Sequence, residues 1–150
     1  MNNNKPNNIL KFISVEKTLE HIEVLYSLLK KRAHKISHIN LPKFQEHKNF
    51  ALNHPYIAWY LIQMNGEWVG TVYLLENNTI SFFLEIQTYE TVQQTLRWML
   101  DNHSPLPGIP SERNANFIFN APITNNSLQS ILNDLGAQEV QITYVLTESL

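Results

Sequence analysis

The sequence TISFFLEIQTYETVQQTLRWMLD, residues 79–101, places a β-strand directly before an α-helix. Its first eight residues are rich in β-branched and aromatic side chains, which predicts a strand over 79–86. Apolar side chains then recur at intervals of three and four residues, which predicts a helix over 91–100. Thr91 and Gln94 fit a capping box at the start of this helix. A strand that leads straight into a helix directs free backbone N–H groups at the junction, so the junction is a natural anion site.

A short strand over 9–13 and two helices are predicted at the start of the chain. Ser14 is a suitable N-cap for the first helix, whose apolar stripe runs through residues 19–29. Pro42 suits the first position of the second helix, and the His-Pro dipeptide at 54–55 ends that helix. The expected order up to this point is therefore strand, helix, helix.

A β-hairpin follows. Asn65 and Gly66 separate two predicted strands, 56–64 and 67–75, and tolerate the positive φ angles of a type I′ turn. Gly70 inside the second strand indicates a bulge or a close approach of another backbone. The aromatic residues of these strands are predicted to form core and cross-strand pairs rather than a binding cage; they are Trp59, Tyr60, Trp68 and Tyr73.

The last third of the chain is predicted to add a strand, a helix and a strand. A proline-rich loop over 102–114 leads into a strand over 115–120. A short helix over 125–135 follows and is closed by Gly136. Residues 139–147 alternate apolar and polar side chains, which predicts a last strand.

These elements predict an α+β fold, a mixed and mostly antiparallel sheet flanked by helices. The strands 79–86 and 115–120 are expected to be parallel, because a helix crosses between them. In the last strand, Tyr144 shares a side with three apolar residues and is predicted to be a core residue, the alternative being a hydroxyl that points into a cleft. His54 is predicted to be structural, at the end of its helix.

Composition indicates a folded domain and excludes several classes of function. Of 150 residues, 43% are hydrophobic and 16% charged, with a net charge of −2, so we expect a packed core and no nucleic-acid partner. There is no cysteine, which excludes a disulfide framework and a thiol nucleophile. No apolar run is long enough to span a membrane. We expect residues 1–8 to be a disordered polar tail and residues 9–150 to be a single domain in the cytoplasm.

The predicted order of elements over residues 9–147 resembles the GNAT superfamily of N-acetyltransferases. Two segments, 47–74 and 125–136, also resemble sequences of this superfamily locally. The resemblance implies a three-layer acyl-CoA N-acyltransferase (GNAT)-like fold, with an opening in the sheet at Ile86. It also implies an enzyme that uses acetyl-CoA as co-substrate and acetylates a small-molecule amine by direct attack on the thioester. An amino sugar or a nucleotide sugar is one such amine. A homodimer is one possible assembly of the protein.

The resemblance further implies a coenzyme A site at the junction of strand and helix. The backbones of Leu84 and Ile86 would hydrogen-bond the pantetheine arm. The backbone amides that would hold the phosphates are those of Thr91, Val92, Gln93 and Gln94. Asn120 and Asn125 would border the same site, and the alternative for both is a turn residue.

Candidate residues for the acceptor amine lie near the first helix and the central strand. The resemblance implies Glu85 or His38 as the base that takes a proton from the amine, and His34 and Ser37 as substrate contacts. The alternative for Glu85 is a side chain that points to solvent from a half-buried strand. His34 and His38 also have a zinc spacing, but no third ligand is evident, so no metal is predicted.

Two departures from the GNAT pattern leave a second function open. The family's glycine-rich phosphate motif falls on 89–94, or on 87–92 in another register, and neither contains a glycine. Glu90 would place a carboxylate against the phosphates. Members of the family often have a tyrosine that protonates the departing thiolate, and this sequence has Leu132 at that position. The alternative is therefore a catalytically inactive GNAT-fold binding or regulatory protein that has lost coenzyme A binding.

Overall fold

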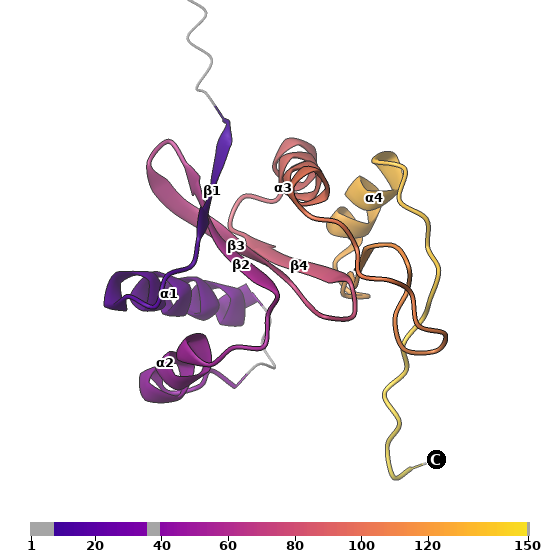
Figure 1. The fold of residues 1–150 in the computed structure, drawn as a ribbon, viewed down its shortest axis with the longest axis horizontal. Coiled ribbons are helices and arrows are strands. Elements are labelled where there is room, and N and C mark those ends of the chain that lie inside the picture. The colour runs from indigo at the N-terminus through magenta and orange to yellow at the C-terminus, as the bar shows by residue number, and fades with distance from the viewer. Residues whose placement is uncertain (1–7, 36–39, 150) are drawn as a thin grey trace, which may run out of the picture. The chain divides into compact units, whose positions relative to one another are not determined.

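The computed structural model describes residues 8–35 and 40–149 (Figure 1). The chain divides into two compact units, Met1–Asn120 and Ala121–Leu150. In the described residues, the first unit contains the β-sheet and three helices, and the second contains one short helix. The predicted tail lies almost wholly outside the described residues, and a single domain over 9–150 stays a prediction.

The first unit is built on a five-stranded sheet whose strands lie in chain order. The strands are β1 (Leu10–Ser14), β2 (Ala58–Met64), β3 (Glu67–Leu74), β4 (Thr79–Leu84) and β5 (Ile118–Phe119). The first four are antiparallel neighbours, and β5 is parallel to β4. This confirms the predicted mixed sheet and its parallel pair, although β5 is shorter than the strand predicted over 115–120.

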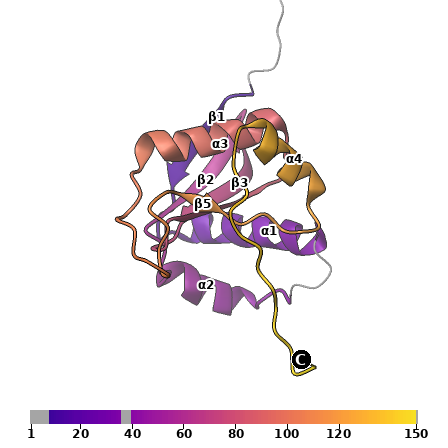
Figure 2. The same ribbon diagram turned by 90° about the vertical axis from the view of Figure 1, so that its right-hand side faces the viewer.

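Helices cover both faces of this sheet: α1 (Leu19–Lys35), α2 (Phe44–Leu52) and α3 (Tyr89–Asn102). Trp59 and Leu61 of β2 belong to one buried cluster with residues of α1 and α2. Tyr60, between them, instead contacts Trp98 of α3, with 4.6 Å between ring centroids. Successive side chains of a strand point to opposite faces, so α1 and α2 lie on one face and α3 on the other (Figures 1 and 2). This confirms the predicted three-layer arrangement.

The first helix begins later than predicted. Ser14 is the last residue of β1 and therefore does not cap α1. Thr18 does so instead: its hydroxyl accepts a hydrogen bond from the His21 amide at 3.3 Å, and its carbonyl accepts one from Ile22 at 3.1 Å. The physical reason is that β1 pairs with β2 along its whole length, up to Ser14 opposite Tyr60, so this backbone stays extended.

The hairpin has the predicted turn. Asn65 and Gly66 have φ angles of 52° and 79°, as a type I′ turn requires. The pairing of β2 with β3 shifts by one residue between Ile62 and Gln63, which is the bulge that Gly70 indicated. The predicted close approach of another backbone is also observed. The carbonyl oxygen of Phe83 on β4 lies so near Gly70 that a Cβ at this position would clash with it.

Asn78 joins the start of β4 to the loop after α3. It has a φ of 66° and is 1% exposed. Its side-chain amide donates to the carbonyls of Leu106 and Asn114, both at 2.8 Å, and its side-chain oxygen accepts from the Leu106 amide. Its carbonyl accepts a hydrogen bond from the Ile118 amide at 3.0 Å. This one residue therefore positions the chain segment that becomes β5.

The helix after β4 begins two residues before the predicted start, and its capping box is a different pair. Thr88 is the N-cap of α3, and Thr91 is its partner. Gln94, the predicted partner, instead accepts a hydrogen bond from the Leu10 amide and donates one to the Asn8 carbonyl, each at 2.9 Å. The spacing rule fits either pair, and the tertiary contact with the β1 segment decides between them.

The second unit contains α4 (Asn126–Asp134). The start of α4 agrees with the prediction, because the Asn125 side chain caps it by accepting a hydrogen bond from the Leu128 amide. The end agrees as well, because Gly136 has the positive φ, 88°, of a residue that closes a helix. The predicted strand over 139–147, with Tyr144 in it, is wrong, since the described residues there form no strand. An alternating pattern supplies two faces, but a strand also requires a paired neighbour, and no described segment pairs with this one.

Candidate functional site

An opening lies at the edge of β4. The parallel pairing of β4 with β5 covers only Thr79 and Ile80. On the other side of β4, the Glu85 amide donates to Val69 of β3 at 2.8 Å. Backbone groups alternate in direction along a strand, so those of Phe82 and Leu84 point away from β3, toward the side on which β5 has already ended. The strands therefore part after Ile80, several residues before the predicted position at Ile86.

The junction between β4 and α3 is closed by its own hydrogen bonds. The Thr91 amide donates to Thr88 Oγ1 at 3.2 Å, and the Thr88 amide donates to Thr91 Oγ1 at 2.9 Å. Thr91 Oγ1 also donates to the Ile86 carbonyl at 2.7 Å. The Val92 amide donates to the Thr88 carbonyl at 3.0 Å. By their position, the amides without an acceptor inside the helix are those of Tyr89 and Glu90.

A hollow of about 450 Å³ lies beside this junction. It is lined by Asn8, Ile9, Met64, Ile86, Thr88, Glu90, Thr91 and Gln94. Glu90 is the acidic residue of the first turn of α3, where a carboxylate stabilises the positive end of the helix dipole. An anion that enters this hollow meets that carboxylate.

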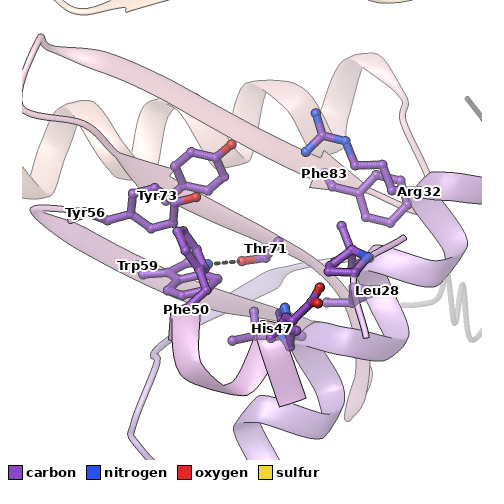
Figure 3. Close-up of a pocket in the computed structure, with 13 residues that line it drawn as sticks. Leu28, Arg32, His47, Phe50, Tyr56, Trp59, Thr71, Tyr73 and Phe83 are labelled. Atoms are coloured by element: carbon purple, nitrogen blue, oxygen red, sulfur yellow. Dashed lines mark hydrogen bonds between the residues drawn. The ribbon is translucent and has the colours of Figure 1, made fainter. Parts of the chain in front are cut away.

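A second cavity, here called the aromatic pocket, lies between the sheet and the helices α1 and α2 (Figure 3). Its volume is about 320 Å³, at the small end of small-molecule sites. Its lining residues are Leu25, Leu28, Leu29, Arg32, Pro42, Glu46, His47, Phe50, Tyr56, Trp59, Thr71, Tyr73 and Phe83. Most of these side chains are apolar or aromatic, so a bound molecule would lose much of its water.

The rings of the pocket are held in fixed positions. Tyr56 and Tyr73 stack with 4.2 Å between ring centroids, and Trp59 Nε1 donates to Thr71 Oγ1 at 2.8 Å. Phe50 contacts Tyr56 edge to face, with 5.6 Å between ring centroids. Burial raises the pKa of the Tyr56 hydroxyl well above its usual range, and the neighbouring Tyr73 raises it further. The Tyr56 hydroxyl is therefore a neutral hydrogen-bond donor at physiological pH.

His47 of α2 is the buried polar residue of the pocket wall. It is 6% exposed, and its Nε2 has no hydrogen-bond partner among the described residues. Burial lowers the pKa of His47, and a hydrogen bond with the backbone of Ile22 raises it by less. A proton on Nδ1, the nitrogen available for the Ile22 carbonyl, leaves Nε2 as a hydrogen-bond acceptor.

Comparison with known proteins identifies the architecture. No family model and no curated protein matches the sequence. A possible acetyltransferase from Clostridium difficile 630 superimposes with a TM-score of 0.61 at 9% identity, covering 93% of this chain and 97% of that one. RimL, a ribosomal protein acetyltransferase in complex with coenzyme A, gives 0.60 at 14% identity, covering 83% and 77%. An aminoglycoside acetyltransferase from an uncultured soil metagenomic sample, in complex with sisomicin, gives 0.59 at 12%, covering 93% and 97%.

The fold is that of the GNAT acetyltransferases. This confirms the architecture that the order of elements implied. At these identities the likeness concerns the fold alone.

The residues expected to hold phosphate in the GNAT fold are otherwise engaged. The Thr91 and Val92 amides donate to Thr88, as described above, and Val92 is fully buried. Gln93 and Gln94 lie inside α3, where the helix takes their amides into its own ladder. Asn125 uses its side chain to cap α4, and Asn120 follows β5. In this structure the Thr91 and Val92 amides already have acceptors in the helix start, and phosphate binding by the amides of 91–94 stays a prediction.

The carboxylate at the end of the central strand has a partner. Glu85 Oε1 lies 2.6 Å from Lys31 Nζ of α1. The side chain is 27% exposed, so neither the buried base nor the fully solvent-facing alternative describes it well. Leu84 is buried, with its backbone directed at the opening, and Ile86 is 47% exposed, with its carbonyl bonded to Thr91.

The remaining acceptor candidates are His34, Ser37 and His38. Ser37 and His38 lie outside the described residues, and His34 is described only as part of α1. Among residues 8–35 and 40–149, no three His, Asp or Glu side chains are grouped as metal ligands. None of the helices in the same ranges is long and apolar enough to cross a membrane.

His47 and Arg32 are the pocket residues that sequence reasoning did not select. His47 occurs at helical spacing with Phe44, Phe50 and Ala51, which placed it on the apolar face of α2. A histidine on such a face signals either a satisfied core residue or a ligand contact, and what bears on this choice is that Nε2 has no partner among the described residues. Trp59 and Tyr73 do pair across strands as predicted, and they line the pocket as well.

Proposed function

We propose that this protein is an N-acyltransferase that moves the acyl group of an acyl-coenzyme A to a primary amine. The observation that carries the proposal is the opening beside Phe82 and Leu84 in a sheet of GNAT architecture. Backbone donors and acceptors on an unpaired strand edge can hydrogen-bond an amide-containing chain as a neighbouring strand would, and pantetheine is such a chain.

The pantetheine arm fits this structure better than the phosphates do. The edge of β4 beyond Ile80 offers backbone groups for the arm, whereas the junction offers only the amides of Tyr89 and Glu90 and holds the Glu90 carboxylate. We therefore expect acyl-coenzyme A to be bound mainly through its pantetheine arm, and weakly at its phosphates. Acetyl-CoA is the simplest donor of this class.

The reaction needs one proton acceptor and one thiolate leaving group. The ammonium form of the substrate gives up a proton, and the nitrogen lone pair forms the new N–C bond at the thioester carbonyl. The C–S bond breaks, a second proton leaves the nitrogen, and the thiolate is protonated to the free thiol. Glu85, beside Lys31, and His38 stay the candidates for the first proton. Since Leu132 lacks a hydroxyl, water or the substrate would protonate the thiolate.

The test is a titration with acetyl-CoA followed by amide NMR. The Phe82 and Leu84 amide signals should move, whereas the Glu85 amide, bonded to Val69, serves as a control in the same strand and should move less. Thermal stability should also rise with ligand, because binding to the folded state alone stabilises it. The absence of both effects at millimolar acetyl-CoA would contradict the proposal.

A second function is favoured by the closed junction. The reciprocal cap of Thr88 and Thr91, with Glu90 beside it, stabilises the helix start without any ligand. A GNAT-fold protein that binds a small molecule but no acyl donor would have this feature. In that case the aromatic pocket would bind its ligand in the titrations below, and acetyl-CoA would cause no change.

A further inference from the structure

Two polar side chains that line the aromatic pocket have binding capacity that no described residue uses. One is His47, whose buried Nε2 lacks a hydrogen-bond partner among the described residues. A buried nitrogen of this kind is costly unless a ligand or water satisfies it. The other is Arg32 of α1, which forms no ion pair with any described residue. Figure 3 shows Arg32 beside Phe83, and His47 apart from them on α2.

Between these two groups the pocket is lined by rings. Phe50 comes from α2, Trp59, Tyr73 and Phe83 come from three strands, and Tyr56 lies just before β2. Aromatic rings attract another ring at edge or offset positions, beyond the effect of buried area. The cavity of about 320 Å³ has room for one such ring with a short substituent. A polyhydroxylated sugar fits poorly, because most of its hydroxyls would lose water without gaining a partner.

We propose that the aromatic pocket binds an aromatic α-amino acid with a hydrogen-bond donor at the far end of its ring, such as tyrosine or tryptophan. Arg32 binds the α-carboxylate, the rings enclose the side chain, and His47 Nε2 accepts the phenol or indole proton. The pair of Arg32 with the carboxylate is charge-assisted and can be bidentate.

This arrangement also positions the amine, and here the inference rests on the proposed function. The α-amino group is adjacent to the carboxylate, so it lies on the side of Arg32 and Phe83. Phe83 lines the pocket, and its neighbours Phe82 and Leu84 direct their backbones at the opening of β4. The amino acid would therefore be the acceptor amine, and its N-acyl derivative the product.

The experiment is an NMR titration of the full chain, without acyl donor, by L-tyrosine, L-phenylalanine and tyramine. Phenylalanine lacks the ring donor, and tyramine lacks the carboxylate. Tyrosine should bind about 5-fold more tightly than phenylalanine, the effect of one neutral hydrogen bond. It should bind at least about 10-fold more tightly than tyramine, the effect of a charge-assisted pair. Equal affinities for the three ligands, or no saturable binding, would overturn the proposal.

Two variants assign each ratio to its residue. His47→Leu should bring tyrosine and phenylalanine to equal affinity and leave the tyrosine-to-tyramine ratio unchanged. Arg32→Gln should do the reverse. His103→Gln is the matched control, since His103 contacts Tyr60 and Trp98 on the opposite face of the sheet and should alter neither ratio. If His47→Leu fails to fold, the ligand series on the unmodified chain still decides. A ratio that persists in the variant predicted to remove it would contradict the assignment.

The outcomes separate this inference from the transferase proposal. Tyrosine binding without any response to acetyl-CoA would support the pocket and contradict the transferase. A response to acetyl-CoA without tyrosine binding would support the transferase and overturn the pocket assignment. With both ligands present, mass spectrometry should detect N-acetyltyrosine.

Discussion

Thr88 and Thr91 cap each other's backbones at the start of α3. The Thr91 amide donates to Thr88 Oγ1 at 3.2 Å, and the Thr88 amide donates to Thr91 Oγ1 at 2.9 Å. Because Thr91 Oγ1 also donates to the Ile86 carbonyl, the same hydroxyl fixes the angle at which β4 leads into the helix. The junction between β4 and α3 is therefore closed by two of its own side chains.

Thr91→Val should lower the free energy of unfolding by about 1 kcal/mol or more, the usual effect of losing an N-terminal cap interaction. Thr91 is 5% exposed, and valine has a similar shape, so the change removes the hydroxyl without opening a cavity. Urea denaturation measures the effect. Thr91→Ser keeps the hydroxyl and should retain most of the stability; if serine and valine are equally destabilising, the cap is not the cause.

Glu90→Gln should strengthen acetyl-CoA binding about two- to fivefold at low salt, because a carboxylate at the helix start is worth roughly 0.3–1 kcal/mol against an arriving anion. Calorimetry at two ionic strengths measures this. Asp101→Asn removes the same charge near the other end of α3 and is the control. Val92→Gly should only destabilise, since Val92 is fully buried and its amide is already bonded. A gain in affinity from Val92→Gly would show that backbone access, and not charge, limits binding.

Asn78→Gly should lower the free energy of unfolding by roughly 2 kcal/mol or more. Glycine accepts the φ of 66°, so the loss reports the side-chain hydrogen bonds to Leu106 and Asn114 and not backbone strain. Thermal and urea melts measure it. Asn116→Ala, an exposed change in the same region, should stay within about 0.5 kcal/mol. Comparable losses in both variants would mean that the loop responds to any change.

Stability should fall as the pH is lowered from about 7 toward 5. Burial lowers the pKa values of His47, His54 and His103 below the ordinary value of 6.5, and at His54 the charge of Lys17 adds to this. Below pH 6.5 these histidines bind protons in the unfolded chain but not yet in the folded chain. The free energy of unfolding therefore decreases as the pH falls from 6.5 to the lower pKa values of the folded state. Urea midpoints at several pH values test this, and His47→Leu should flatten the curve. Stability that is constant or rises on acidification would contradict it.

Local sequence patterns predicted most of the first unit. Asn65 and Gly66 fixed the hairpin, because few dipeptides tolerate two positive φ angles in succession. The run 79–101 predicted a strand that leads into a helix. Because this helix connects β4 to β5, the two strands were expected to be parallel, as they are. The strand predicted over 139–147 failed for the opposite reason: its alternation is local, but pairing depends on a neighbour that the pattern does not specify.

The sequence by itself determined the order of the elements, the turn, and the absence of glycine from the junction, since each depends on residues close together in the chain. Only the tertiary structure decided which residues form the candidate site. His47 is placed on an apolar helix face by spacing alone, but whether its Nε2 finds a partner depends on what α1 and three strands bring around it, and none of the described residues supplies one. Glu85 is likewise fixed on its strand by sequence, but its ion pair with Lys31 joins residues 54 positions apart. Hydrogen-bond satisfaction and charge pairing depend on distances in space, and the fold sets those distances.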